Sequence, residues 1–231
     1  MTFSLHQGVV FNNYFSNVAS NLDRNIPHSN KSPLNFLRAP VENSFFCAPS
    51  DREEIVNLIR RQNKSTDLMN IPVFIYKILA SIISPTVSML FNNSVSEGIL
   101  VFSYFHVAFL VKNIWEIDAR LDSYLKSNNI LCANQFGFRK NSNTSDAIIE
   151  LIDYVYSSLD SKQSTIAVYL DFSKKFDTVN HNILMSKHLH NGVGSVMQHW
   201  FESYLNNRKQ YVSIKNCNSY MSNITFGVPQ G

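Results

Sequence analysis

Residues 166–181 have the sequence IAVYLDFSKKFDTVNH, in which an apolar run is followed directly by charged and polar residues. The apolar start, Ile166 to Leu170, is typical of a short buried strand, and the strand ends at the carboxylate of Asp171. A carboxylate at the edge of a core costs several kcal/mol unless it is paired, hydrated or bound to a metal. The residues alone leave two interpretations: Asp171 is a metal ligand, or Asp171 or Ser173 caps a following helical turn.

The composition indicates a globular protein with one large domain or two small ones. The 231 residues are 45% hydrophobic and 13% aromatic, which is enough apolar material for a core. The net charge of +3 is compatible with nucleic-acid binding but does not indicate it. A disulfide framework and a structural zinc site are both disfavoured, because the cysteines are widely spaced and outside any C-x-x-C pattern: Cys47, Cys132 and Cys217.

The sequence predicts neither secretion nor a membrane span. Residues 1–10 lack the basic start and apolar core of a signal peptide. The most hydrophobic run, Ile99 to Val111, has 13 residues and stops at Lys112, whereas a span needs roughly 18 to 20. We therefore expect an intracellular protein, cytoplasmic or nuclear, without a membrane; membrane association through this run is the alternative.

The N-terminal half is predicted to be a lead-in followed by a helical layer. Residues 1–49 are rich in Asn and Ser and contain four of the seven prolines, which predicts an extended or poorly ordered segment. The run Ser50-Asp-Arg-Glu53 fits a capping box with Ser50 as the N-cap of a helix. A second helical pattern begins near Val73; we expect Pro85 to interrupt it and Gly98 to end it.

Residues 99–118 fit neither helical nor strand periodicity, and from there on helices alternate with short strands. The predicted helices are 119–126, a helix capped by Ser145 and reaching Leu159, a helix capped by His181 and reaching Leu189, and 196–204. The predicted strands are 166–170, 210–214 and 222–226. The expected fold class is α+β, mostly helical, with one small antiparallel sheet.

Three blocks stand in a specific order along the second half: Gln135-Phe-Gly-Phe-Arg139, Leu170 to His181, and Phe226-Gly-Val-Pro-Gln-Gly231. In this order and spacing, residues 119–231 resemble the reverse transcriptase domain of non-LTR (LINE-type, jockey-like) retrotransposons. The resemblance implies an incomplete right-hand polymerase with partial fingers and palm, preceded by the helical region 50–118. Each block alone is a weak signal, and the three in register are highly specific.

The resemblance implies a role for each matched residue. Asp171 corresponds to the palm aspartate that binds the catalytic metals, so Mg²⁺ is the implied cofactor of a two-metal phosphoryl transfer to a primer 3′ hydroxyl. The resemblance also implies a nucleotide site with Phe172, Phe176, Gln230 and Gly231: the backbone carbonyl of Phe172 can reach a metal, Phe176 is the gate beneath the incoming sugar, and Gln230, in a turn with Gly231, contacts the deoxynucleoside triphosphate.

The basic residues of the matched blocks are the implied contacts with the RNA template and DNA primer. Arg139 and Lys140 are the first phosphate contacts expected, with Arg208 and Lys209 as further ones, and Gly227 lets backbone approach the nucleic acid. Taken alone, the residues of the matched blocks have plainer interpretations. Phe176 would be a core aromatic, residues 227–231 an ordinary turn, and residues 139–140 a solvated loop.

Three departures from the family pattern bear on activity. The sequence ends at Gly231, before the Tyr/Phe-x-Asp-Asp block that supplies further metal-binding carboxylates, and residues 107–118 replace a basic fingers segment. Lys175 stands where the family has a small Ala, where its cation would clash or mis-pair with Asp171. We expect a polymerase by descent that is inactive as these residues alone; the alternative is a non-catalytic nucleic-acid-binding or relic fragment.

Overall fold

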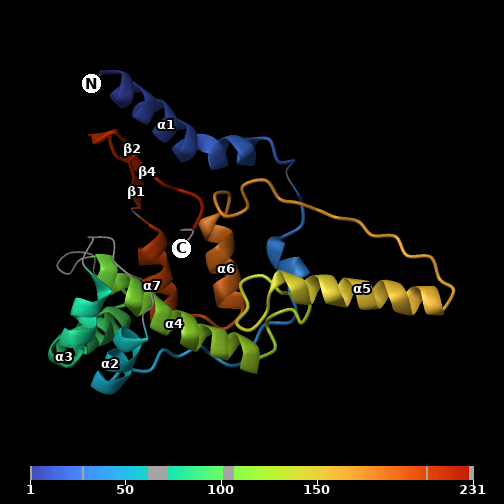
Figure 1. Ribbon diagram of the computed structural model, residues 1–231, viewed down its shortest axis with the longest axis horizontal. Coiled ribbons are helices and arrows are strands. Elements are labelled where there is room, and N and C mark those ends of the chain that lie inside the picture. Colours follow the sequence, from blue (N-terminus) through green and yellow to red (C-terminus); the bar gives the residue numbers. More distant parts are fainter. Residues whose placement is uncertain (1, 28, 62–71, 101–106, 207, 229–231) are drawn as a thin grey trace. The chain divides into compact units, whose positions relative to one another are not determined.

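The computed structural model describes the chain except residues 1, 28, 62–71, 101–106, 207 and 229–231 (Figure 1). The chain forms two compact units, Met1–Tyr124 with Lys174–Gly231, and Leu125–Ser173. Helices are the main regular structure of the described residues, and in chain order they are α1 (Thr2–Arg24), the 3₁₀ helix η1 (Pro33–Phe36), α2 (Arg52–Arg60), α3 (Val73–Glu97), α4 (Val107–Ser127), α5 (Thr144–Asp160), α6 (His181–His190) and α7 (Ser195–Leu205).

The prediction of an extended or poorly ordered lead-in is wrong for residues 2–24, which form the 23-residue helix α1. This helix lies against strands from the C-terminal end of the chain, as Figure 1 shows for the blue helix and the red strands. The side chain of Asn12 is fully buried, and its Nδ2 donates to Tyr220 O and Ser222 Oγ, each at 2.8 Å. Contacts with residues more than 200 positions away stabilise α1, and the local composition does not reveal them.

The helix predicted after residue 50 is α2, and its N-cap is Asp51 rather than Ser50. Asp51 Oδ1 accepts a hydrogen bond from Glu54 N at 2.8 Å, while the backbone N–H of Ser50 donates to Asn92 Oδ1. The prediction is therefore one residue off, because the buried Ser50 is held by α3. The apolar residues shared by the two helices are Ile55, Ile59, Ala80 and Val87.

Helix α3 continues through Pro85, so the predicted interruption is wrong. Proline cannot donate to the carbonyl four residues earlier, here Ser81 O. The guanidinium of Arg52 in α2 donates to Ser81 O at 2.8 Å and so satisfies the acceptor that Pro85 leaves free. The predicted end at Gly98 is confirmed, since Gly98 is the left-handed C-cap with φ +65°.

By length and composition alone, α3 is able to cross a membrane. It has 25 residues, a mean hydropathy of 1.7 over 18 residues, and 22% of that window is buried. Buried core helices of soluble proteins meet the same criteria, so length and composition do not establish a membrane span. That the protein associates with no membrane remains a prediction. The run Ile99 to Val111, on which that prediction was based, lies partly outside the described residues.

The main core of the first unit gathers around α7. Trp200 is 1% exposed and donates from Nε1 to Ser94 Oγ at 3.0 Å, which joins α7 to α3. Phe91 and Met197 belong to the same apolar cluster. The predicted helix 196–204 is thus confirmed, and its apolar stripe faces this core.

The strands are short and form two antiparallel pairs. Strand β1 (Lys209–Gln210) pairs with β4 (Ser222–Asn223), and β2 (Ser213–Ile214) pairs with β3 (Cys217–Asn218). The predicted strands 210–214 and 222–226 are confirmed in part, as two-residue strands that begin at residues 209, 213 and 222, and the described strands form two sheets rather than the one expected. A mostly helical chain with small antiparallel strands agrees with the expected α+β class.

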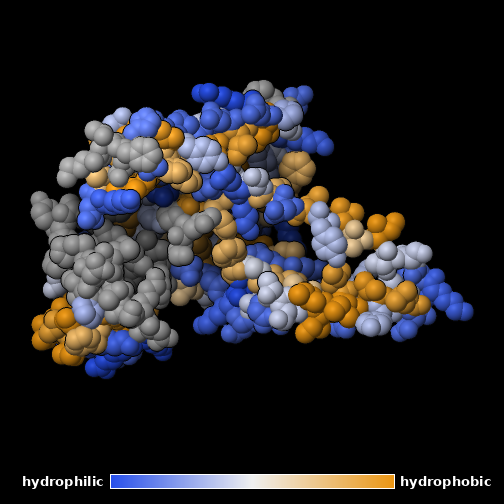
Figure 2. Space-filling model, turned by 45° about the horizontal axis from the view of Figure 1, so that its top comes forward, coloured by the Kyte–Doolittle hydropathy of each residue, from blue (hydrophilic) through white to orange (hydrophobic). Residues whose placement is uncertain are grey.

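In the second unit, α5 confirms the predicted helix but not its cap. Asn143, not Ser145, is the N-cap, in a reciprocal capping box with Asp146. Several apolar side chains of α5 remain exposed, among them Ile148, Ile149 and Leu159. Exposed apolar groups of this kind are the orange surface regions of Figure 2.

The predicted buried strand 166–170 is wrong within the described part of the chain. Residues 164–172 have no strand or helix assignment, and Ile166 and Leu170 are 89% and 82% exposed. A strand requires a hydrogen-bonded neighbour. The strands with which 166–170 was expected to pair instead pair with one another in the first unit.

Candidate functional site

Within the first unit, residues 176–180 of the second sequence block meet residues 226–228 of the third block. The backbone N–H of Val228 donates to Phe176 O at 2.9 Å, and that of Gly227 donates to Val179 O at 2.8 Å. An isolated antiparallel bridge pairs Asn180 with Phe226. The 176–181 segment and the 226–228 segment are therefore held side by side through their backbones.

Gly227 lies at the closest point of this contact. Its φ is +81°, in the left-handed region that side chains other than glycine rarely adopt. A Cβ at this position would lie 2.8 Å from Asp177 O and 3.0 Å from both Asp177 Cα and Phe176 O. The glycine is thus required by the approach of the chain's own backbone, and the closer approach of nucleic acid there stays a prediction.

Two side chains converge on the carbonyl oxygen of Gly227. His181 Nε2 donates to it at 2.8 Å, and Arg208 Nη1 donates at 3.2 Å. The predicted helix-capping role of His181 is wrong, because Asn180 is the N-cap of α6 and accepts from Ile183 N. No sequence pattern indicated the His181 contact, since it joins residues 46 positions apart.

Arg208 is the predicted nucleic-acid contact with the most unusual surroundings. It is half-buried, and burial lowers the pKa of its guanidinium, while the neighbouring Tyr204 acts in the opposite direction. Burial also raises the pKa of Tyr204, an effect that Arg208 partly offsets. Lys209, the other predicted contact here, is exposed in β1.

Lys175 lies over the predicted sugar gate. Its Nζ is 4.8 Å from the centroid of the Phe176 ring, a cation–π distance, and Phe176 itself is half-buried. Phe176 therefore presents a ring whose face is partly covered by a cation. The predicted interference of Lys175 with Asp171 stays a prediction.

The remaining described candidates belong to the second unit. Asp171 and Phe172 are exposed, and Phe172 is 74% accessible. Arg139 Nη1 donates to Cys132 O at 3.4 Å, and Lys140 is exposed. Arg139 is half-buried, whereas the exposure of Asp171 and Lys140 leaves their charged groups available to a ligand without assigning one.

A metal site is incomplete within the residues that the structure describes. Among them, no group of three or more His, Cys, Asp or Glu is placed to hold a metal ion. Asp171 provides one carboxylate, whereas two metal ions about 4 Å apart need several such ligands. Gln230 and Gly231, the predicted nucleotide contacts, lie outside the described residues.

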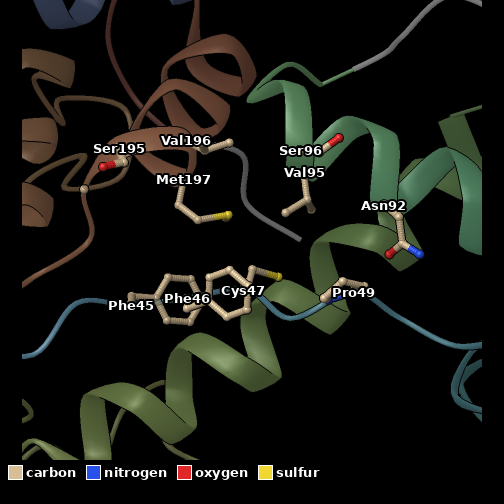
Figure 3. A pocket seen from close by; sticks show the side chains of 11 residues that line it. Phe45, Phe46, Cys47, Pro49, Asn92, Val95, Ser96, Ser195, Val196 and Met197 are labelled. Atoms are coloured by element: carbon tan, nitrogen blue, oxygen red, sulfur yellow. The ribbon is translucent and has the colours of Figure 1, made fainter.

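One cavity of the first unit is apolar and contains no predicted site residue (Figure 3). It has a volume of about 230 Å³, and its lining includes Phe45, Cys47, Val95 and Met197. Its lining residues come from the 45–49 segment, the end of α3 and the start of α7. Such a lining lacks the charged groups that phosphoryl chemistry or phosphate binding requires.

Comparison with known proteins identifies the family. Residues 107–231 match the model of the reverse transcriptase (RNA-dependent DNA polymerase) family. The chain is 31% identical over 123 residues to the "Probable RNA-directed DNA polymerase from transposon BS" of Drosophila melanogaster. The aligned residues are 52% of this chain and 14% of that protein. It is also 29% identical over 115 residues to the "Probable RNA-directed DNA polymerase from transposon X-element" of the same species, and these residues are 50% of this chain and 13% of that protein.

The matched stretch of the chain thus spans about one-seventh of the length of these curated relatives. The matched residues include all three sequence blocks, among them the 176–180 and 226–228 segments that the first unit holds side by side. The resemblance predicted from these blocks is confirmed. The chain belongs to the reverse transcriptase (RNA-dependent DNA polymerase) family.

Proposed function

We propose that this chain contributes to the RNA-directed DNA polymerase of a retrotransposon. The observation that carries the proposal is the backbone coupling of Phe176 to Val228, with a 2.9 Å hydrogen bond between them. A nucleotide-binding surface that uses Phe176 and the turn after Phe226 needs these two segments in a fixed relation, and this hydrogen bond supports such a relation. Both relatives are named as polymerases, which supports this function over a non-catalytic fragment.

The proposed substrates are deoxynucleoside triphosphates, with an RNA template and a DNA primer. Phe176 is the proposed gate against a 2′ hydroxyl, Gln230 is a proposed nucleotide contact, and the backbone carbonyl of Phe172 is proposed to reach a metal at the nucleotide site. We also propose that the chain forms part of the fingers and palm of a right-hand polymerase. Its support is the helix-rich chain with small antiparallel strands beside the coupled blocks.

Family membership implies a divalent metal cofactor, and we propose Mg²⁺ with Asp171 as one ligand. Carboxylate oxygens suit Mg²⁺, which keeps several waters and substrate phosphates in its coordination shell. The described residues do not by themselves fit a complete two-metal site. The carboxylate of Asp171 is therefore assigned to metal binding, and no chemical step is assigned to it alone.

Primer extension on an RNA template tests this function. The 231-residue chain is compared with the same chain extended by a downstream Asp-Asp segment and a basic fingers segment, each with Mg²⁺. We expect extension only from the completed protein, because one carboxylate does not hold two metal ions. Extension by the 231 residues alone, abolished by Asp171→Ala, would contradict the expected inactivity.

Asp171→Asn in the completed protein isolates the metal ligand. We expect a rate loss of more than about 100-fold, the upper range for losing even an outer partner of a metal ligand. Asp177→Asn is the matched control, since Asp177 is an exposed aspartate of the same stretch. The proposal fails if both variants retain activity, or if the two lose it equally.

Lys175→Ala in the same protein tests the cation that lies over Phe176. Removing the ammonium group uncovers the ring face and removes a positive charge near the proposed nucleotide site. We expect higher activity than with Lys175. An unchanged or lower rate would show that Lys175 does not hinder the site.

A further inference from the structure

A second cavity in the first unit is polar and larger, with a volume of about 520 Å³. It lies where the start of α6 meets the ends of α7 and β4. Its polar lining consists of four asparagines, one threonine, one histidine and one arginine: Asn180, Asn182, Asn206, Asn223, Thr225, His181 and Arg208. Among the described residues of its lining there is no carboxylate, and Arg208 supplies the formal charge.

The guanidinium of Arg208 is a partly desolvated cation without a carboxylate partner in this lining. Arg208 is half-buried, and this burial lowers the pKa of its guanidinium, because a charge is less favourable away from water. Its described hydrogen bond, to Gly227 O, uses one of five N–H donors. A buried charge is stabilised by an anion that accepts the remaining donors.

The N-terminal end of helix α6 also borders this cavity and adds to its positive potential. Its first two residues, His181 and Asn182, line the cavity, and its N-cap is Asn180. The first N–H groups of a helix lack intrahelical partners, and the helix dipole makes this end favourable to anions. The N–H of Ile183 already donates to Asn180 Oδ1, so the backbone donors in question are those of His181 and Asn182. The amides of Asn182 and Asn206 provide further neutral donors and acceptors around it.

An acidic side chain lines an adjoining cavity rather than this one. Glu202 lines an adjoining cavity, which shares His181, Asn182 and Asn206 with this one. Gln198 Nε2 donates to Glu202 Oε1 at 3.2 Å. The carboxylate of Glu202 is therefore hydrogen-bonded within α7, outside the lining that surrounds Arg208.

We propose that the cavity around Arg208 binds a phosphate group of nucleic acid. Arg208 supplies the charge, the start of α6 supplies backbone donors, and the asparagines surround the phosphate and its sugar. The choice of ligand rests on the proposed function, since a polymerase handles phosphates in its template, primer and nucleotide. The site includes one residue expected from the sequence, Arg208, and assigns a role to the polar residues around it.

Fluorescence anisotropy with a labelled single-stranded RNA of roughly 12 nucleotides tests the cavity, at salt concentrations between about 50 and 200 mM. We expect Arg208→Gln to weaken binding severalfold and to reduce the slope of log affinity against log salt by about 0.7, the value for one lost contact to a single strand. The matched control is Arg60→Gln, at an exposed arginine of α2 outside the cavity.

Asn182→Asp tests the same cavity without removing the hydrogen bond to Gly227. The change is isosteric and exposed, and a carboxylate near a helix N-terminus favours the helix, so the fold is kept. A new negative charge in the lining repels phosphate, and we expect severalfold weaker RNA binding. Asn57→Asp, at an exposed asparagine of α2, is the control for added charge.

Competition identifies the source of the phosphate. Displacement of the RNA by thymidine triphosphate without metal, sensitive to Asn182→Asp, assigns the site to a nucleotide; resistance to it assigns the site to the strand. RNA binding that neither variant changes overturns the cavity alone and leaves the polymerase proposal to primer extension. Failure of the wild-type chain to bind RNA overturns the cavity and weakens the proposed function with it.

Discussion

Replacing Gly227 by alanine tests the backbone contact that joins the two sequence blocks. The left-handed φ of +81° costs an alanine about 1 to 2 kcal/mol. Its methyl group would meet Asp177 O at 2.8 Å and two further backbone atoms at 3.0 Å. Backbone atoms cannot rotate away as a side chain does, so overpacking adds about 1 to 3 kcal/mol.

The combined loss is about 3 kcal/mol, or roughly a 100-fold change in the ratio of folded to unfolded protein. Urea unfolding followed by tryptophan fluorescence measures it, because Trp200 lies in the core of the same unit. With an m value of about 2 kcal/mol/M, the midpoint should fall by about 1.5 M.

The control is Gly137→Ala, because a Cβ added to Gly137 meets nothing within 4 Å. Its effect should stay within about 0.5 kcal/mol. A Gly227→Ala protein with the wild-type midpoint would refute the close packing of the 226–228 segment on residues 176–177. Equal losses in both variants would refute the assignment of the effect to this contact.

Two further predictions concern buried polar groups of the first unit. Asn12→Ala should lower the free energy of unfolding by roughly 2 kcal/mol and expose α1 to limited proteolysis, because Tyr220 O and Ser222 Oγ lose their donor; the exposed Asn13→Ala should do neither. For His188, burial lowers the pKa below the usual 6.5, so the unfolded chain binds a proton that the folded chain resists. Stability should therefore fall as the pH drops below about 6.5, and in His188→Phe that loss should shrink, as thermal melts across pH will measure.

Local patterns predicted the features that depend on neighbouring residues. The helices at 145–159 and 196–204 follow from apolar side chains that recur with the period of a helix. The end of α3 at Gly98 follows from the ability of glycine to adopt a left-handed backbone. The caps were one or two residues off, since a Ser, Asn or Asp beside the true cap has the same hydrogen-bonding ability.

The candidate site was predictable in its residue types and not in its contacts. The three blocks identified the family, and Arg208 was among the residues expected to meet nucleic acid. The convergence of His181 and Arg208 on Gly227 O was not predictable, because three positions far apart in sequence contribute.

The sequence by itself therefore determined the family, the residue types of the site and most of the helices. Only the tertiary structure decided that α1 is ordered by Asn12, and that Pro85 is tolerated because Arg52 satisfies Ser81 O. Only the tertiary structure, likewise, left residues 166–170 without a strand partner among the described residues. The physical reason is the same in each case: a hydrogen bond or strand pairing depends on a partner elsewhere in the chain, which local periodicity does not encode.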